Sequence, residues 1–87
     1  MSVTLEFFGL TRHRAGRPSL TVEASTLGEA LEAAAAELPQ LEVDCIAGGR
    51  LRPGFLANLN GQRFMMDPAT PLEPGDAVLI LSSDVGG

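Results

Sequence analysis

The last three residues of the chain, Val85, Gly86 and Gly87, are the part of the sequence best suited to take part in a reaction. Glycine lacks a Cβ atom, so two consecutive glycines can extend, adopt positive φ and pass close to another protein's backbone. The small side chains also leave the carbonyl carbon of Gly87 open to a nucleophile. We therefore expect chemistry at the Gly87 carboxylate, performed by a partner's active site rather than by a pocket of this protein.

Other side chains offer weaker sites. Cys45 has no second cysteine and no metal-ligand cluster near it, which favours a structural thiol; a sulfur relay would require it to lie near Gly87. His13 is a single histidine that we expect on the surface, and Met65 with Met66 predicts core filling rather than a soft-metal site. The sequence contains no glycine-rich phosphate loop with a following Lys-Ser or Lys-Thr pair. We expect no metal and no bound cofactor, and nucleotide binding should belong to a partner.

Composition indicates one small domain. The chain has 87 residues, a hydrophobic fraction of 45% and a net charge of −5. Nucleic-acid binding requires clustered positive charge, so the acidic balance argues against it. No apolar run approaches the ~20 residues of a membrane-spanning helix, and the start of the chain lacks the features of a signal peptide. We expect a cytoplasmic protein that binds neither nucleic acid nor membrane.

All six basic residues are arginine, so the chain has no lysine that could accept an acyl group. Its own C-terminus could still be transferred to an amine elsewhere. The arginines form two small groups, which are Arg12, Arg14 and Arg17 with His13, and Arg50 with Arg52. Two interpretations stay open: solvated loops, or a positive surface that steers the chain toward an acidic partner.

The start of the chain predicts two strands joined by a loop. Residues 3–7 alternate apolar and polar side chains with the period of two that is typical of a half-buried strand. Residues 9–18, which contain two glycines and a proline, predict the loop, and residues 19–23 the second strand.

A helix is predicted directly after the second strand. Thr26 and Glu29 have the spacing of a capping box, in which each side chain bonds a backbone N–H that the helix leaves unpaired. The following apolar residues recur at steps of three and four, which makes one apolar stripe. Pro39 disfavours helical geometry at Leu38 and so ends the helix.

The rest of the chain predicts short strands and tight turns. Residues 40–54 predict an irregular connection with room for a short helical turn. Asn60-Gly61 is a strong hairpin signal because both central positions of a type I′ turn need positive φ. The sequence Glu73-Pro74-Gly75-Asp76 suits a type II turn. The predicted strands of this half are residues 55–59, 62–65 and 77–82.

This order of elements predicts an α+β fold of the β-grasp type, a mixed sheet packed on one main helix. The first and last strands should lie side by side and parallel at the centre of the sheet. We expect residues 1–82 to form this domain and residues 83–87 to form a flexible C-terminal Gly-Gly tail.

Side-chain alternation divides the central strands between two faces of the sheet. Facing the helix we expect the apolar set Val3, Leu5, Phe7, Val78 and Ile80. The opposite face then receives Phe8, Leu79 and Leu81, which a single helix cannot cover. Exposed apolar patches mark interaction surfaces, so we expect these three residues to bind a partner. The alternative is a two-sided core, with the middle segment folded over that face.

Five segments together resemble the MoaD/ThiS family of ubiquitin-like sulfur carriers. These are residues 3–8, Thr26-Leu27-Gly28-Glu29-Ala30-Leu31, Asn58-Leu59-Asn60-Gly61, residues 71–78 and the terminal Gly86-Gly87. The similarity spans nearly the whole chain. It implies that the chain is not an enzyme, and that Gly87 is adenylated by an E1-like, ATP-dependent enzyme and converted to a thiocarboxylate.

The resemblance also implies a second protein, which accepts the sulfur. Molybdenum cofactor biosynthesis is the leading pathway, with this chain as the small subunit of molybdopterin synthase and a MoaE-like large subunit as acceptor. The alternatives are a carrier for thiamine thiazole, cysteine or tRNA thiolation, a ubiquitin-like protein modifier, and a β-grasp binding module that never reacts at its end.

Overall fold

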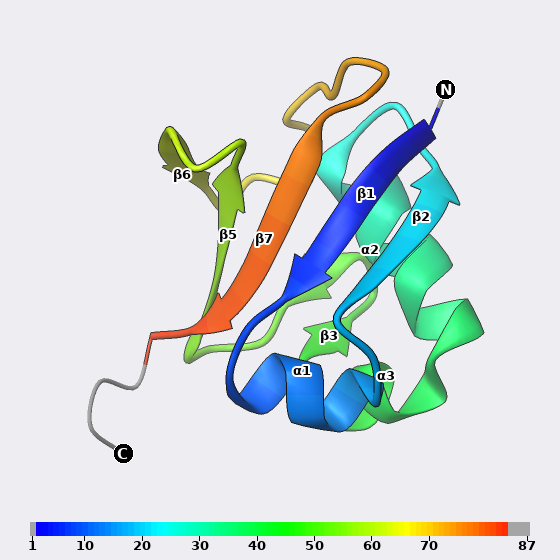
Figure 1. Cartoon of the computed structure of the whole chain (residues 1–87), viewed down its shortest axis with the longest axis vertical. Helices are drawn as coiled ribbons and strands as arrows, with labels where there is room; N and C mark the ends of the chain where they lie inside the picture. The colour runs from blue at the N-terminus through cyan, green and yellow to red at the C-terminus, as the bar shows by residue number, and fades with distance from the viewer. Residues whose placement is uncertain (1, 84–87) are drawn as a thin grey trace.

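The computed structural model describes residues 2–83, so Val85, Gly86 and Gly87 lie outside the described residues. Ten elements follow one another along the chain (Figure 1). They are β1 (Ser2–Phe7), α1 (Leu10–Ala15), β2 (Ser19–Glu23), α2 (Leu27–Glu37), α3 (Pro39–Asp44), β3 (Ile46–Ala47), β4 (Arg50–Leu51), β5 (Phe55–Leu59), β6 (Arg63–Met65) and β7 (Ala77–Ser82).

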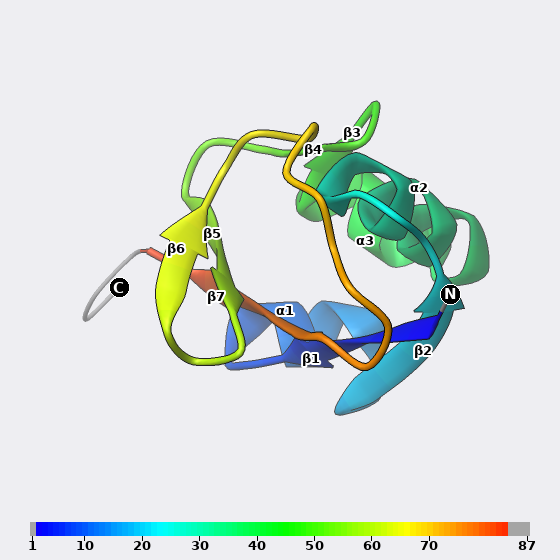
Figure 2. The ribbon, with the colours of Figure 1, turned by 90° about the horizontal axis from the view of Figure 1, so that it is seen from above.

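Five of the strands form one mixed sheet in the order β2-β1-β7-β5-β6. The first and last strands, β1 and β7, are parallel neighbours, and the other pairs are antiparallel. The helices α2 and α3 lie together on one face of this sheet (Figure 2). The α+β architecture of the β-grasp type is therefore confirmed, with α2 as its main helix.

The core lies between α2 and the inward side chains of the sheet. Val3, Leu5 and Phe7 of β1 are buried, as are Val78 and Ile80 of β7, which confirms the predicted inner face. Opposite them α2 buries one side of the helix, which consists of Leu27, Ala30, Leu31, Ala34 and Ala35.

The start of α2 has the predicted cap. The Glu29 N–H donates to Thr26 Oγ1 at 3.2 Å, and the Glu29 carboxylate accepts from the Ser25 N–H at 2.7 Å. The carboxylate thus reaches one residue further back than in the standard capping box. The helix ends at Glu37, two residues before Pro39, as predicted.

The prediction of a plain loop over residues 9–18 is wrong, because α1 occupies its middle. Gly16 closes this helix in the left-handed conformation, with φ of 74°, and its N–H bonds the Arg12 carbonyl at 2.9 Å. Thr11 is the buried residue of the helix. A glycine that ends a helix and a glycine in a loop look alike in sequence, and six residues with one buried threonine give no apolar period.

The middle segment is more regular than predicted. Pro39 both ends α2 and lies in the first turn of α3. Its missing N–H breaks no hydrogen bond there, because the first N–H groups of a helix have no partner within the helix. The short pair β3 and β4 follows, and the segment buries Leu41, Cys45 and Ile46 against the helix side of the molecule. The alternative of a two-sided core is therefore wrong.

The two predicted turns are both present. Asn60 and Gly61 have φ of 54° and 72°, and the Gln62 N–H donates to the Leu59 carbonyl at 2.9 Å, which closes the β5–β6 hairpin. In the second turn Gly75 has φ of 87°, and the Asp76 N–H donates to the Glu73 carbonyl at 3.1 Å.

The carboxylate of Asp76 links these turns. It accepts hydrogen bonds from the Glu73 N–H at 2.8 Å and from Asn60 Nδ2 at 3.1 Å. These bonds favour the ionised carboxylate and lower the pKa of Asp76, with the Glu73 N–H as the larger cause. The side-chain oxygen of Asn60 accepts from the Ala77 N–H at 2.8 Å, so the network fixes the start of β7.

Acid should therefore remove the contribution that the ionised Asp76 carboxylate makes to the free energy of unfolding. A carboxyl group with a lowered pKa in the folded state stabilises the fold above its ordinary pKa of 3.8, and this contribution is lost as pH falls through the lowered value. We expect Asp76→Asn to unfold at lower urea concentration than the wild type at pH 7, and the gap between the two midpoints to shrink toward pH 2. A gap that is equal at both pH values would contradict the assignment.

Candidate functional site

Part of the sheet face opposite α2 is apolar, and neither α2 nor α3 covers it (Figure 2). We call it the open face and define it as Phe8, Leu56, Phe64, Leu79 and Leu81. The side chains of Phe8 and Phe64 are 48% and 60% exposed, and the three leucines are partly exposed. Figure 2 shows the helices α2 and α3 on the other side of the sheet.

Strand register assembles the open face from segments far apart in sequence. Leu81 lies opposite Leu56, and Leu79 lies opposite Asn58, which in turn lies opposite Phe64 of the edge strand. The structure thus brings together Leu79 and Leu81, as predicted, and extends the patch across β5 and β6. The Asn58 side-chain oxygen is buried within this row and has no hydrogen-bond partner among the described residues.

Phe8 and the end of β7 are held by one buried hydroxyl group. Thr11 Oγ1 accepts from the Phe8 N–H at 3.0 Å and lies 2.8 Å from the Phe8 carbonyl and 2.6 Å from the Ile80 carbonyl. Its single proton can be donated to one of these carbonyls at a time. The last described residue, Ser83, donates its N–H to the Gly54 carbonyl at 2.8 Å. The chain therefore leaves the sheet beside the open face, at the end of the molecule where α1 lies (Figure 1).

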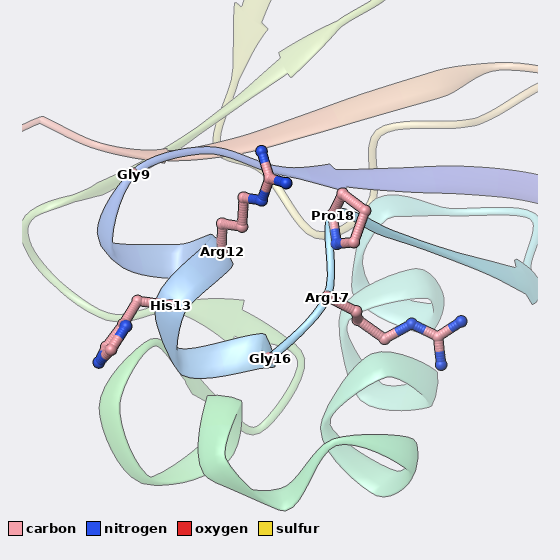
Figure 3. Close-up of a pocket in the computed structure, with 6 residues that line it drawn as sticks. All are labelled: Gly9, Arg12, His13, Gly16, Arg17 and Pro18. Carbon is pink, nitrogen blue, oxygen red and sulfur yellow. The ribbon is translucent and has the colours of Figure 1, made fainter.

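Basic side chains surround α1. Arg14 Nε lies 3.2 Å from an Asp44 carboxylate oxygen, which ties α1 to α3. Arg12, His13 and Arg17 line a shallow hollow of about 430 Å³. Figure 3 shows that their side chains point in three different directions, so they do not converge on one anion.

The remaining candidate residues fall outside this site. Cys45 is buried in the core, and its burial together with the nearby Asp44 carboxylate raises the pKa of the thiol, so it stays neutral. His13 is exposed, as expected. Met65 is a core residue, but Met66 is 49% exposed, so the prediction of core filling was wrong for it. Within residues 2–83 no cluster of metal-ligating side chains is found, and no helix is long and apolar enough to cross a membrane.

The sheet order, the parallel β1–β7 pair and the single main helix define a ubiquitin-like β-grasp protein. No protein-family model and no curated protein matches the chain, whereas solved structures do. The HVO 2177 protein of Haloferax volcanii is 30% identical, with a TM-score of 0.78 over 100% of this chain and 87% of that one. A chain of the complex of subunits 1 and 2 of the Helicobacter pylori molybdopterin-converting factor is 26% identical, with a TM-score of 0.67 over 100% of both chains.

A third structure, SAMP1 of Haloferax volcanii, has the higher TM-score of 0.84 over 100% of both chains. Its identity of 23% makes this a likeness of fold. The chain belongs to the MoaD/ThiS family of ubiquitin-like proteins. The solved structures that it resembles include those of small archaeal modifier proteins and of a complex of molybdopterin-converting-factor subunits.

Proposed function

We propose that this protein is a sulfur carrier whose Gly87 carboxylate is adenylated by an E1-like enzyme and then converted to a thiocarboxylate. The leading pathway is molybdopterin biosynthesis, in the cytoplasm, with the large subunit of a synthase as acceptor. One observation carries the proposal: a chain whose last residues are Gly86 and Gly87 aligns along its whole length with a subunit of a molybdopterin-converting factor.

The proposed chemistry explains why a partner must supply the active site. A carboxylate is a poor electrophile, so its oxygen first attacks the α-phosphorus of ATP and pyrophosphate leaves. A sulfur nucleophile then attacks the acyl-adenylate carbon and displaces AMP, which leaves sulfur on Gly87 in place of one oxygen. Once docked on the acceptor, this tethered sulfur is held at high effective concentration. The chain lowers no barrier in either step.

The open face supplies the docking surface in this proposal. Phe8 and Phe64 are exposed aromatic side chains, and buried aromatic anchors carry much of the binding free energy at protein interfaces. The open face lies beside the point where the chain leaves β7, so a partner that covers it is next to the start of the tail. That partner can bind the body of the protein and admit residues 84–87 to its active site at the same time.

Truncating an aromatic side chain of the open face should weaken docking. We expect Phe8→Ala to raise the Kd for the adenylating enzyme by about 30-fold, because alanine removes an exposed aromatic anchor. Val43→Ala is the matched control, since Val43 is 66% exposed but belongs to α3 on the other side of the sheet. Isothermal titration calorimetry measures both. Equal affinities of the two variants would show that the enzyme docks elsewhere.

The first chemical step tests the proposed function. The untagged protein, mixed with the adenylating enzyme of its own organism and ATP, should cause release of pyrophosphate in proportion to the protein added. No release above the enzyme's background would contradict the proposal.

A second candidate is a protein modifier that is joined to target lysines through Gly87. The likeness to SAMP1, a small archaeal modifier protein, favours it. The two functions share the adenylation step and differ in the nucleophile that displaces AMP. Gly-Gly remnants on lysines of other proteins, found by peptide mass spectrometry of cells that make the chain, would establish modification. Their absence would leave sulfur transfer.

A further inference from the structure

A second hollow, of about 260 Å³, lies at one corner of the open face. Glu6 of β1 and Ser19 of β2 are register partners on the outward side of the sheet, and both line it together with Phe8 of the open face. The cation of the hollow comes from α1, since Arg12 also lines it. Figure 3 shows the Arg12 side chain extending from α1 toward the β1 ribbon, beside Pro18. A guanidinium group therefore stands at the edge of the apolar patch.

The Arg12 guanidinium has no hydrogen bond or ion pair to any residue within 2–83, unlike the guanidinium groups of Arg14 and Arg17. Arg14 pairs with Asp44, and Arg17 Nε donates to the Ser19 carbonyl at 2.8 Å. Glu6 lines the same hollow, but no ion pair joins it to Arg12. All five N–H donors of the guanidinium are thus available to a ligand from outside, and a planar fork of this kind matches a carboxylate in a bidentate arrangement.

We propose that Arg12 pairs with a carboxylate of the adenylating enzyme when that enzyme covers the open face. The proposal rests on the proposed function, because it takes the partner to be the enzyme that acts on Gly87. An apolar patch alone allows a partner to slide or rotate, whereas one charge pair at its edge fixes the register. Docking over Phe8 also removes water from the hollow, which strengthens the pair relative to one on an open surface.

The pairing predicts a graded series of affinities. Against the adenylating enzyme of the same organism, Arg12→Ala should raise the Kd by about 10-fold, and Arg12→Glu should raise it further because like charges then meet. Arg12→Lys should fall between the wild type and Arg12→Ala, since it keeps the charge but loses the fork. Arg50→Ala is the matched control, an exposed arginine on the β3–β4 pair on the helix side. Its Kd should equal that of the wild type.

Ionic strength and the substitution Glu6→Gln give two further, independent tests of the Arg12 pairing. The ratio of the Kd of Arg12→Ala to the Kd of the wild type should fall as ionic strength rises, because salt screens the ion pair. Glu6→Gln should leave the Kd unchanged or lower it, since it removes a carboxylate that repels the proposed one. Circular dichroism should show unchanged folding for every variant, because none of these side chains packs in the core.

The outcomes separate this inference from the function on which it rests. If pyrophosphate is released and Arg12→Glu binds as tightly as the wild type, the pairing is wrong and the carrier function stands. A weaker complex with Glu6→Gln would also overturn the pairing, because the enzyme would then offer a cation there. If Arg12→Glu weakens binding but no pyrophosphate is ever released, the pairing stands and the function fails. A wild-type chain that does not bind the enzyme overturns both.

Discussion

Deleting Gly86 and Gly87 should abolish ATP-dependent pyrophosphate release while the protein stays folded and still binds its adenylating enzyme. The reacting carboxylate would then belong to Val85, whose branched side chain crowds the carbonyl carbon and whose position lies two residues closer to the sheet. The core residues of β7 nearest the deletion are Val78 and Ile80, so the core itself is untouched. We expect activity at background level, measured by release of pyrophosphate with the purified enzyme.

Binding and folding are the controls for this deletion. Calorimetry should give a Kd within a few-fold of the wild type, because the open face supplies most of the docking surface, and the melting temperature should not change. A tag added after Gly87 should have the same effect on activity, since it blocks the carboxylate. Full activity of the truncated chain would show that the chemistry is not at the diglycine end.

Leu5→Ala should lower the free energy of unfolding by about 3 kcal/mol, the usual cost of emptying a buried leucine site. Leu5 is fully buried in β1, where its register partners are Leu20 of β2 and Val78 of β7. All three side chains face α2, so alanine leaves a cavity at the centre of the core. Stabilities of small domains are about 5–15 kcal/mol, which makes this a large share of the total.

Thr4→Ala is the matched control on the same strand. Thr4 lies on the opposite face of β1, where its hydroxyl is 3.5 Å from that of Thr21. Substitutions at such surface positions usually change stability by about 0.5 kcal/mol or less. Urea unfolding followed by circular dichroism measures both variants. A larger loss for Thr4→Ala than for Leu5→Ala would reverse the assignment of the two faces.

The elements that local chemistry determines could be predicted from the sequence. Asn60-Gly61 forms its turn because both residues tolerate positive φ, and Thr26 caps α2 because its hydroxyl accepts the Glu29 N–H. Strand β7 coincides with the predicted residues 77–82, an apolar run that follows directly on a predicted turn. In these places each local preference agrees with the final fold.

Elements that depend on tertiary contacts could not be predicted. The helix α1 is fixed by Thr11, whose hydroxyl lies within hydrogen-bonding distance of carbonyls of Phe8 and Ile80, and Ile80 is far away in sequence. Likewise Leu41 and Ile46 become core residues only because α3 and β3 pack beside α2. Short helices without an apolar period carry too little sequence signal to identify them.

The candidate site was predictable only in its central strands. Alternation around β7 placed Leu79 and Leu81 on the open face, but Leu56 and Phe64 join them through the order of strands in the sheet. In the structure Phe55 and Ala57 of β5 are buried, so Leu56 between them points to the open face. The sequence does not show that β5 is the neighbour of β7 in the sheet. The sequence predicts a loop around Arg12 and gives no sign that this residue lies at the edge of the open face.

The mass of the untagged protein, purified from the cells that make it, tests the central claim most directly. A fraction of the molecules should be heavier by the exchange of one oxygen for one sulfur, and fragmentation should assign the added mass to Gly87. The fraction should vanish when the gene for the adenylating enzyme is deleted. Unmodified Gly87 in every molecule, in cells where the adenylating enzyme is active, would contradict the account.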